Sequence, residues 1–373
     1  MREGWEYKSY TWSEVLTIIN GKNQSAVLNA DGKYPIYGSG GIMGYANDYL
    51  CPEDTVVIGR KGNINKPLYV ATKFWNVDTA FGLDADRTIL SPKYLFYFCL
   101  DYNFERHNKA VTIPSLTKAD LLKIKMKLPS LNNQLTIVSE LDQINELIRL
   151  KKEQLKDYDD LAQSIFYDMF GDPVENDKGW EVKKVCDICD KISDGPFGSN
   201  LKSEHYVDMG IRVIRLQNIG VGKFIDTDKA YITGEYYQTL LRYTCRPGEI
   251  IIGTLGSPNL RACKIPNEIS VSIHKADCVH IVPNNKLANA DYWVGLFNSP
   301  TFVRNKSNFV HGQTRGRISY GQIKEFQVPL PPLPLQQTFA ARITQIEQQK
   351  AEVQKAIADL ETLLASRMQY WFE

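Results

Sequence analysis

The chain has 373 residues, of which 43% are hydrophobic and 11% aromatic; this composition is enough for two packed cores and excludes wholesale disorder. Its 44 basic and 43 acidic side chains give a net charge of +1, so any contact with nucleic acid must come from local patches. The first residues lack an apolar signal segment and no apolar run approaches about 18 residues, so we expect a cytoplasmic protein without a membrane span. Seven scattered cysteines are expected to be buried thiols rather than disulfides.

Residues 1–127 and 171–329, named module one and module two, read as α/β (α+β) modules with a strand bias. Short β-branched and aromatic runs between Gly, Pro and Asn clusters predict strands at 55–58, 69–72, 212–216 and 249–252. An Asn or Ser before a helical apolar pattern predicts helices near 91–100 and 289–298. The glycines near residue 40 do not fit a nucleotide-binding loop and are explained by a turn.

Each module and the segment that follows it form one copy of a repeat. The strongest match pairs residues 128–170 with residues 330–372, at a constant offset of 202 from Gln134 and Gln336 onward. A Gly-Trp-Glu step opens each copy, but there the offset is only 175. The second copy has therefore acquired residues in its first half, and each copy is a globular module followed by one long helix.

The long helices, expected at 128–170 and 330–373, carry a heptad repeat. Five heptads with mostly apolar a and d positions, in the same frame in both copies, are typical of a coiled coil. The alternative is an amphipathic helix packed on its own module, which leaves the shared frame unexplained and an apolar seam exposed. We predict that the helices pair through an interface that includes Ile137, Leu141, Ile144, Ile148, Leu155, Ile343, Ile346, Val353, Ile357, Leu360 and Leu364.

The length of these helices suggests an arrangement for the whole chain. A helix of about 35 residues is about 50 Å long, so the first helix is expected to carry the chain from module one to module two, and the second to run back. The predicted fold is an antiparallel coiled-coil pair that separates two modules related by an approximate two-fold axis. Equivalent sites on B-DNA recur about 34–36 Å apart. We interpret the helix pair as a ruler between two short DNA sequences.

Local charge supports contact with DNA. Each module has a net charge of +3, whereas 128–170 carries −4 and 330–373 carries −1. Residues 301–317 contain four basic residues and no acid, interleaved with Asn, Gln and Gly, which suits base-edge and phosphate hydrogen bonds. A merely solvated basic loop is the alternative, and Arg60 and Lys61 could equally cap a strand. The nominated DNA-binding residues are Arg60, Lys61, Asn63, Arg106, Lys109, Asn200, Lys202, Arg304, Lys306, Gln313, Arg315 and Arg317.

Three stretches carry a resemblance to a known family. IPSLTKADLLKIKMKLPSLNNQ (113–134), RISYGQIKEFQVPLPPLPLQQ (317–337) and DGPFGSNLKSEHY (194–206) resemble specificity subunits of type I restriction-modification systems, and the likeness covers essentially the whole chain. That family usually has a Glu-Gln step after the proline-rich turn; this chain has Asn133-Gln134 and Leu335-Gln336 instead.

The resemblance implies a division of labour along the chain. Residues 1–127 and 171–329 would be target recognition domains, each reading half of a bipartite site in double-stranded DNA. The helices at 128–170 and 330–373 would dock methyltransferase subunits and, through the complex, restriction subunits.

The sequence lacks the groups that catalysis needs. A Walker A loop fails at Phe224, where Ser or Thr is required, and neither an adenine-methyltransferase loop nor a nucleophilic triad is found. No metal site is predicted from the lone C-x-x-C of Cys186 and Cys189, whose loose companions are Cys263, His274, Cys278 and His280. We expect a non-catalytic subunit without its own cofactor, with S-adenosylmethionine, ATP and Mg²⁺ on partner subunits only. The alternatives are an assembly scaffold that does not bind DNA and a fused restriction-modification enzyme.

Overall fold

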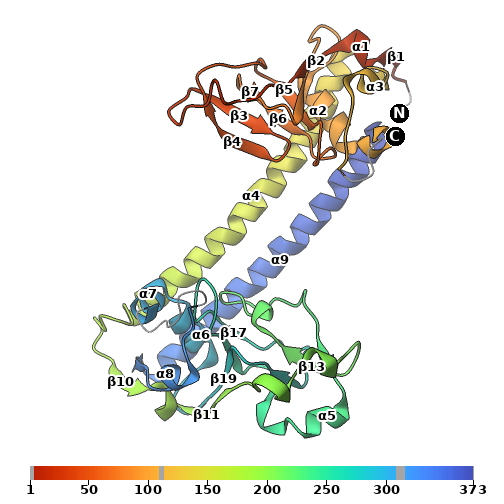
Figure 1. Cartoon of the computed structure of the whole chain (residues 1–373). Helices are drawn as coiled ribbons and strands as arrows, with labels where there is room; N and C mark the ends of the chain where they lie inside the picture. The colour runs from red at the N-terminus through yellow and green to blue at the C-terminus, as the bar shows by residue number, and fades with distance from the viewer. Residues whose placement is uncertain (1–3, 109–112, 308–315, 373) are drawn as a thin grey trace. The chain divides into compact units, whose positions relative to one another are not determined.

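A computed structural model describes residues 4–108, 113–307 and 316–372, and the chain divides into two compact units. Unit 1 is Met1–Glu153 with Gln354–Glu373, and unit 2 is Gln154–Val353. The predicted long helices are α4 (Leu131–Phe170) and α9 (Leu333–Phe372), of 40 residues each. Each unit therefore contains one module together with parts of both long helices (Figure 1).

Module one contains a four-stranded sheet covered by a helix, a three-stranded sheet and a two-stranded pair. Its elements are β1 (Lys8–Thr11), α1 (Trp12–Val15), β2 (Leu16–Asn20), β3 (Tyr34–Gly38), β4 (Gly41–Ala46), β5 (Thr55–Gly59), β6 (Leu68–Val70), β7 (Trp75–Asn76), β8 (Ala80–Ala85), α2 (Pro92–Asp101), η1 (Phe104–His107), α3 (Lys118–Leu121) and β9 (Lys125–Leu128). The larger sheet is antiparallel, in the order β2-β8-β5-β6, and α2 packs on it. The smaller sheet has the order β4-β3-β7, with β3 and β7 parallel, and β1 pairs with β9.

Module two repeats this design with a larger second sheet. Its elements are β10 (Glu181–Lys184), η2 (Val185–Asp187), β11 (Cys189–Asp194), η3 (Gly198–Asn200), η4 (Ser203–His205), β12 (Tyr206–Val207), β13 (Ile211–Ile214), η5 (Leu216–Asn218), β14 (Tyr231–Ile232), α5 (Gly234–Gln238), η6 (Leu241–Tyr243), β15 (Thr244–Cys245), β16 (Ile250–Gly253), β17 (Ala262–Lys264), β18 (Ser272–His274), β19 (Cys278–Pro283), α6 (Ala290–Asn298), α7 (Pro300–Lys306), α8 (Tyr320–Lys324) and β20 (Gln327–Leu330). One sheet has the order β11-β19-β16-β17 and is covered by α6. The other has the order β12-β14-β13-β18-β15, and β10 pairs with β20.

The two modules correspond strand for strand, which confirms the internal repeat. β2, β8, β5 and β6 match β11, β19, β16 and β17 in order, and the parallel pair β3 and β7 matches β13 and β18. The second sheet of module two has five described strands where that of module one has three. Four of the five lie before residue 250, in the stretch where the repeat offset grows.

The predicted strands and helices are present, although the strands predicted at 69–72 and 212–216 end two residues early, at Val70 and Ile214. Burial explains their composition. Val56 and Ile58 of β5 face the main core of module one, whereas Val57 faces a second core under the smaller sheet. In β16, Ile250 and Ile252 likewise face the main core of module two, whereas Ile251 faces a second core. A strand covered on both faces has no solvent side, so these segments read as continuous apolar runs. The glycines near residue 40 form the turn between β3 and β4, as expected.

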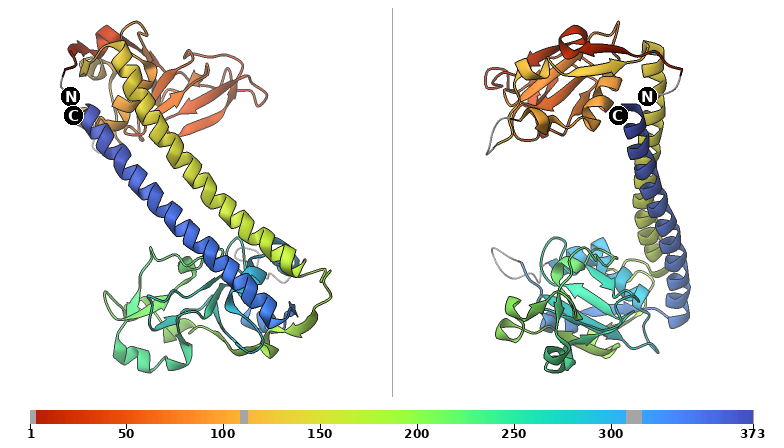
Figure 2. Two further views of the ribbon diagram at one scale, coloured as in Figure 1. Left: turned by 180° about the vertical axis from the view of Figure 1, so that it is seen from behind. Right: turned by 90° about the vertical axis from the view of Figure 1, so that its right-hand side faces the viewer.

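In unit 1, α4 and α9 lie side by side and run in opposite directions (Figure 2). Arg367 of α9 forms an ion pair with Glu140 of α4. Twelve residues further along α4, Lys152 Nζ lies 2.8 Å from a carboxylate oxygen of Glu361, six residues earlier in α9. Advancing along one helix therefore means going back along the other, which confirms the predicted antiparallel pairing within this unit.

In unit 2 the same two helices pair in the same sense. Lys350 Nζ of α9 lies 2.8 Å from a carboxylate oxygen of Asp159 in α4. The rings of Phe166 and Phe339 pack edge to face with centroids 5.8 Å apart, and both belong to the main core of module two. The end of α4 and the start of α9 are thus part of the core that the module builds.

A buried glutamine anchors the start of α4 to module one. The Gln134 side chain is fully buried, and its Oε1 accepts a hydrogen bond of 2.9 Å from the backbone N–H of Ser91, which precedes α2. Its Nε2 donates to the carbonyls of Ile89 and Pro129, at 2.9 and 3.0 Å. One side chain therefore satisfies three backbone groups that would otherwise be buried without partners.

The start of α9 repeats this anchor in module two. The fully buried Gln336 accepts a hydrogen bond of 2.8 Å from the N–H of Asn289, the residue that caps α6. It donates to the carbonyls of Leu287 and Pro331, at 3.1 and 2.7 Å. The glutamine that recurs in both sequence copies therefore attaches the start of each long helix to its module through hydrogen bonds.

The seven cysteines are free thiols. Five are buried, as expected, whereas Cys186 and Cys189 are half-buried. In the part of the chain that the structure describes, no helix is both long and apolar enough to cross a membrane.

Candidate nucleic-acid interface

In module two, loops distant in sequence are held together beside β16. The N–H of Ile318 donates a hydrogen bond of 3.1 Å to the carbonyl of Thr254, directly after that strand. Gly195 lies so close to the backbone of Lys275 that an added Cβ would be 2.3 Å from its carbonyl carbon, so only glycine fits there. We name the residues 194–202, 254–260, 275–277 and 316–318 the loop cluster of module two.

Arg317 lies within this cluster and links three of its segments. Its guanidinium is 3.5 Å from a carboxylate oxygen of Asp194 and 3.2 Å from one of Asp277, and it stacks over the ring of Phe197. Burial raises the pKa of Asp194, and the charge of Arg317 opposes that rise. Two carboxylates engage the half-buried side chain of Arg317, and its contact with DNA stays a prediction.

The other nominated residues of module two differ in exposure. Asn200 and Lys202 are exposed on the loop cluster, where the ring of His205 accepts a hydrogen bond of 3.0 Å from the N–H of Lys202. Arg304 is exposed in the last turn of α7, whereas Lys306 is half-buried over two phenylalanine rings. The nominated residues Gln313 and Arg315 lie outside the described residues.

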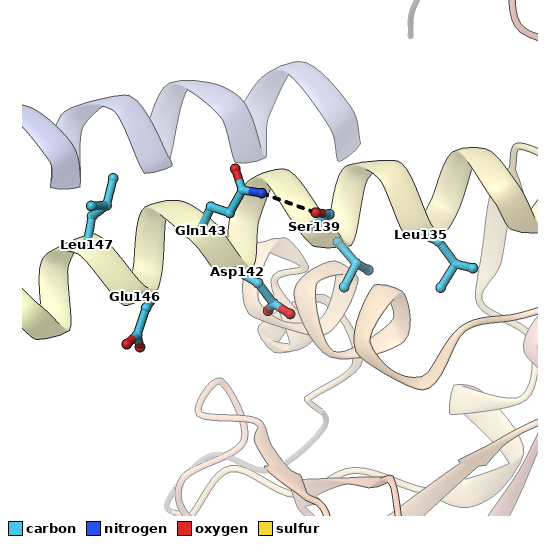
Figure 3. A pocket seen from close by; sticks show the side chains of 7 residues that line it. Leu135, Ser139, Asp142, Gln143, Glu146 and Leu147 are labelled. Atoms are coloured by element: carbon cyan, nitrogen blue, oxygen red, sulfur yellow. Dashed lines mark hydrogen bonds between the residues drawn. The ribbon is translucent and has the colours of Figure 1, made fainter.

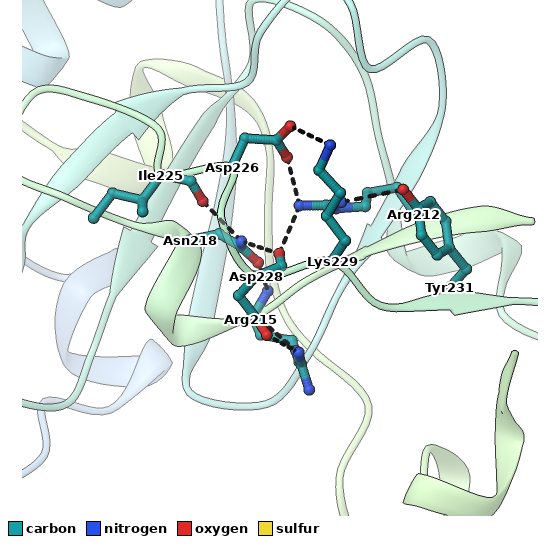
Figure 4. A network of polar contacts seen from close by, with 8 residues as sticks. All are labelled: Arg212, Arg215, Asn218, Ile225, Asp226, Asp228, Lys229 and Tyr231. Atoms are coloured by element: carbon teal, nitrogen blue, oxygen red, sulfur yellow. Dashed lines mark hydrogen bonds and ion pairs between the residues drawn. The ribbon is translucent and has the colours of Figure 1, made fainter. Parts of the chain in front are cut away.

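A polar network that sequence reading missed supports the residues 218–229 of module two (Figure 4). Arg212, only 6% exposed, donates hydrogen bonds to the carboxylate of Asp226 at 2.6 Å and to the carbonyl of Asp228 at 2.7 Å. Arg215 binds the carboxylate of Asp228, and Asn218 donates to the same carbonyl. The network fixes this long connection on β13. Its only sequence signal is an R-x-x-R step followed by a D-x-D step.

Module one holds its equivalent loops in the same way. The N–H of Leu116 donates to the carbonyl of Arg60 at 2.9 Å, just as Ile318 does to Thr254 in module two. Lys61 forms a β-bridge with Ser115, and Leu255 forms one with Arg317. We name the residues 59–65, 103–108 and 114–116 the loop cluster of module one.

The structure brings four nominated residues of module one onto this cluster. Arg60, Lys61 and Asn63 follow β5, and Arg106 lies in η1; all four are exposed. The segments meet where the side chain of Asn65 accepts a hydrogen bond of 2.8 Å from the N–H of Phe104. Arg60 also binds the carbonyl of Asp78, so it supports the strand end as well as facing solvent. Lys109 lies outside the described residues.

The eleven nominated residues of the helix interface are all buried or half-buried. Ile137 and Leu141 belong to the main core of module one, and Leu364 packs against the same core. Ile343 packs against the main core of module two. The buried positions are Ile137, Leu141, Ile144, Ile148, Ile346, Val353 and Ile357, and the half-buried ones are Leu155, Ile343, Leu360 and Leu364.

A shallow groove lies on α4 in unit 1 (Figure 3). Leu135 and Leu147 line it and are 50% and 47% exposed. Asp142 also lines it, but Lys93 and Tyr97 of α2 already bind its carboxylate. The groove therefore combines exposed apolar side chains with acidic ones.

Comparison with known proteins gives one consistent result. A family model described as type I restriction modification DNA specificity domain matches residues 3–157 and 177–362. The type I restriction enzyme MjaVIII specificity subunit of Methanocaldococcus jannaschii is 21% identical, over 97% of this chain and 92% of that protein. The type I restriction enzyme EcoDI specificity subunit of Escherichia coli is 20% identical, over 91% and 81%.

Solved structures have the same fold. The S subunit of a type I restriction-modification system from M. genitalium matches with a TM-score of 0.59 at 15% identity, over 100% of this chain and 98% of that one. A chain from work on the complex assembly and conformational transition of the type I R-M system matches with a TM-score of 0.61 at 16% identity, over 99% and 98%. Both the larger and the smaller sheets of each module thus belong to a known architecture.

Proposed function

We propose that this chain, which belongs to the type I restriction modification DNA specificity family, reads a bipartite DNA site, with one half-site bound by the loop cluster of each module. The observation that carries the proposal is the duplication itself. Two modules of one fold hold equivalent loops with equivalent backbone bonds, from Leu116 to Arg60 and from Ile318 to Thr254. A duplicated reader suits a target in two parts.

The two readers differ in the side chains that they present. At an offset of 194, Arg60 and Lys61 correspond to Thr254 and Leu255, while Gly62 corresponds to Gly256. Both glycines have a positive φ, of +80° and +103°, so the backbone path is retained while the contacting groups change. Bases are distinguished in the major groove by their donor and acceptor patterns. The two half-sites should therefore differ in sequence.

The helices would serve two purposes in this function. Leu135, Leu147, Leu150, Leu161 and Leu363 are 45–50% exposed on α4 and α9, which supports docking of methyltransferase subunits there and of restriction subunits through the complex. A helix of 40 residues is about 60 Å long, and this length would set the gap between half-sites. This chain would be non-catalytic, and the partner subunits would carry out catalysis and bind S-adenosylmethionine, ATP and Mg²⁺. The complex would act in the cytoplasm.

A salt-dependent DNA mobility shift tests the proposal. Phosphate contacts release counterions, so affinity should fall steeply with salt concentration. Lys202→Gln and Arg304→Gln should each weaken binding and lower the salt slope by about 1 if each contacts one phosphate. Lys178→Gln is the matched control, since Lys178 is also exposed but lies outside both the loop cluster and α7. No shift with any duplex, in the presence of methyltransferase partners, would favour the assembly scaffold that does not bind DNA.

Half-site assignment needs a separate experiment. Methylation mapping in cells that carry the chain with its methyltransferase partner would report both half-sites and their gap. The double variant Arg60→Gln and Lys61→Gln should relax only the half-site read by module one. Adding one heptad to both helices should change the tolerated gap, and an unchanged gap would remove the ruler from the proposal.

A further inference from the structure

Three side chains that can bind metal meet between the two sheets of module two. Cys245 comes from β15, His274 from the end of β18 and His280 from β19, and all three are fully buried. One ligand atom of each lies within 4.8 Å of the corresponding atoms of the other two. The proposed DNA recognition does not use this cluster.

One nitrogen of each imidazole already lies next to an oxygen acceptor. His280 Nε2 lies 2.8 Å from a carboxylate oxygen of Glu249, and His274 Nδ1 lies 3.1 Å from the carbonyl oxygen of Tyr243. Both oxygens only accept, so the nitrogen that faces each must carry the proton. In a neutral imidazole the remaining nitrogen carries a lone pair and can only accept a hydrogen bond or bind a metal.

The two remaining nitrogens are buried without a partner. His274 Nε2 and His280 Nδ1 make no hydrogen bond within the described parts of the chain, and the two ring centroids are 5.4 Å apart. A buried acceptor without a donor is costly, and two in one cluster call for a shared positive group. A histidine whose outer nitrogen donates to a carboxylate or a carbonyl is also the usual arrangement around protein-bound metals.

We propose that Cys245, His274 and His280 bind a zinc-class divalent ion. One thiolate and two neutral imidazoles are ligands suited to zinc, with bonds of about 2.0–2.3 Å that place ligand atoms about 3.5 Å apart. The Cys245 Sγ lies 3.3 Å from His274 Nδ1, the nitrogen that also faces the Tyr243 carbonyl, so the His274 ring must turn over to present its Nε2 to the ion. Binding releases the thiol proton of Cys245, because the metal takes the thiolate. Water fills the fourth position.

Module one supplies an internal comparison. The pairing of Cys245 with Ser272 corresponds to the bridge between Cys51 and Phe74, and the pairing of Ile251 with His280 corresponds to that of Val57 with Gly82. By these registers, the positions equivalent to the three ligands hold Cys51, Asn76 and Gly82. Module one retains the thiol but neither imidazole. The chain should therefore bind one ion and not two.

The ion would tie the two sheets of module two to the loop cluster. The turn between His274 on β18 and Cys278 on β19 contains the residues 275–277, which contact Gly195 and Arg317. An ion that pins both strands would fix that turn. This consequence for DNA binding rests on the proposed function, whereas ion binding itself does not.

Cobalt(II) titration of the purified full-length chain tests the site directly. Cobalt bound to a thiolate gives a sulfur-to-metal charge-transfer absorption, so the wild type should reach one equivalent with this band and lose it when zinc is added. Zinc should also raise the unfolding temperature of chelator-treated protein. Absence of the band, or an unfolding temperature that zinc leaves unchanged, would overturn the site.

Variants identify the ligands. Cys245→Ser, a near-isosteric change, should abolish the band, and His280→Asn should weaken cobalt binding at least tenfold. Cys51→Ser and Cys186→Ser should behave as wild type. A band that survives in Cys245→Ser, or that disappears in Cys186→Ser, would refute the assignment. If circular dichroism shows that Cys245→Ser does not fold, an unchanged cobalt affinity in His280→Asn would refute the assignment instead. If the chain binds cobalt but not DNA, the metal site is supported and only the proposal of DNA recognition fails.

Discussion

Replacing Gln336 by Leu should detach α9 from module two. The change removes the hydrogen bonds to Asn289, Leu287 and Pro331, all inside a fully buried site. One N–H and two carbonyls are left without partners, and at about 1 kcal/mol each the expected loss is about 3 kcal/mol. That loss is a large share of the stability of a typical domain.

Hydrogen exchange measured by mass spectrometry provides a local assay. The backbone N–H of Asn289 donates to the Gln336 side chain, so a loss of about 3 kcal/mol in local stability should speed exchange at the start of α6 by roughly 150-fold. Gln337→Leu, at the exposed neighbouring position, is the matched control. Gln134→Leu should move the same effect to the start of α2 in module one.

Two results would refute this reasoning. One is a loss below about 1 kcal/mol in denaturant unfolding of Gln336→Leu, with exchange at the start of α6 unchanged. The other is equal loss in Gln336→Leu and Gln337→Leu. Either result would mean that packing of the helix, rather than the buried amide, attaches it to the module.

Three further changes test the charged contacts. Burial raises the pKa of Asp194 while the charge of Arg317 opposes this, so Arg317→Met should raise that pKa further. A carboxyl pKa raised above its ordinary value of 3.8 costs stability as pH rises, so the variant should lose more stability than wild type between about pH 4 and pH 7. Urea unfolding that shows the same loss in both proteins over this pH range would contradict the reasoning. Arg212→Ala should cost about 2 kcal/mol in urea unfolding, a figure discounted because its partner Asp226 is 53% exposed, and a loss below about 0.5 kcal/mol would show that the network is dispensable. Lys350 lies seven residues from both Ile343 and Ile357 in the buried stripe of α9, and its side chain is 14% exposed. Lys350→Leu should therefore be neutral or stabilise the chain by up to about 1 kcal/mol. A clear fall in melting temperature would show that the ion pairs of Lys350 dominate.

Much of the fold could be predicted from sequence because its signals are local or periodic. The apolar runs at β5 and β16 are strands covered on both faces, and the heptad frame marks the buried stripes of α4 and α9. The constant offset beyond Gln134 and Gln336 marked a structural equivalence, although the purpose of the glutamine appeared only with its three backbone partners.

The candidate sites depend on contacts that sequence spacing does not encode. The residues next to Arg317 in sequence carry no acid, so sequence reading did not show that Asp194 and Asp277, from other loops, are its carboxylate partners. Cys245 was missed as a companion of His274 and His280 because strand pairing, rather than a short motif, brings it to them. Hydrophobic periodicity gives the faces of strands, but not which loops meet at their ends.

The last residues of the chain complete the core of its first module. Trp371 stacks on Trp5 with ring centroids 5.4 Å apart, and Met368 is buried in the same core as Trp12. Residues 368–371 of α9 therefore contribute to the packing of module one, and their removal should uncover part of its core.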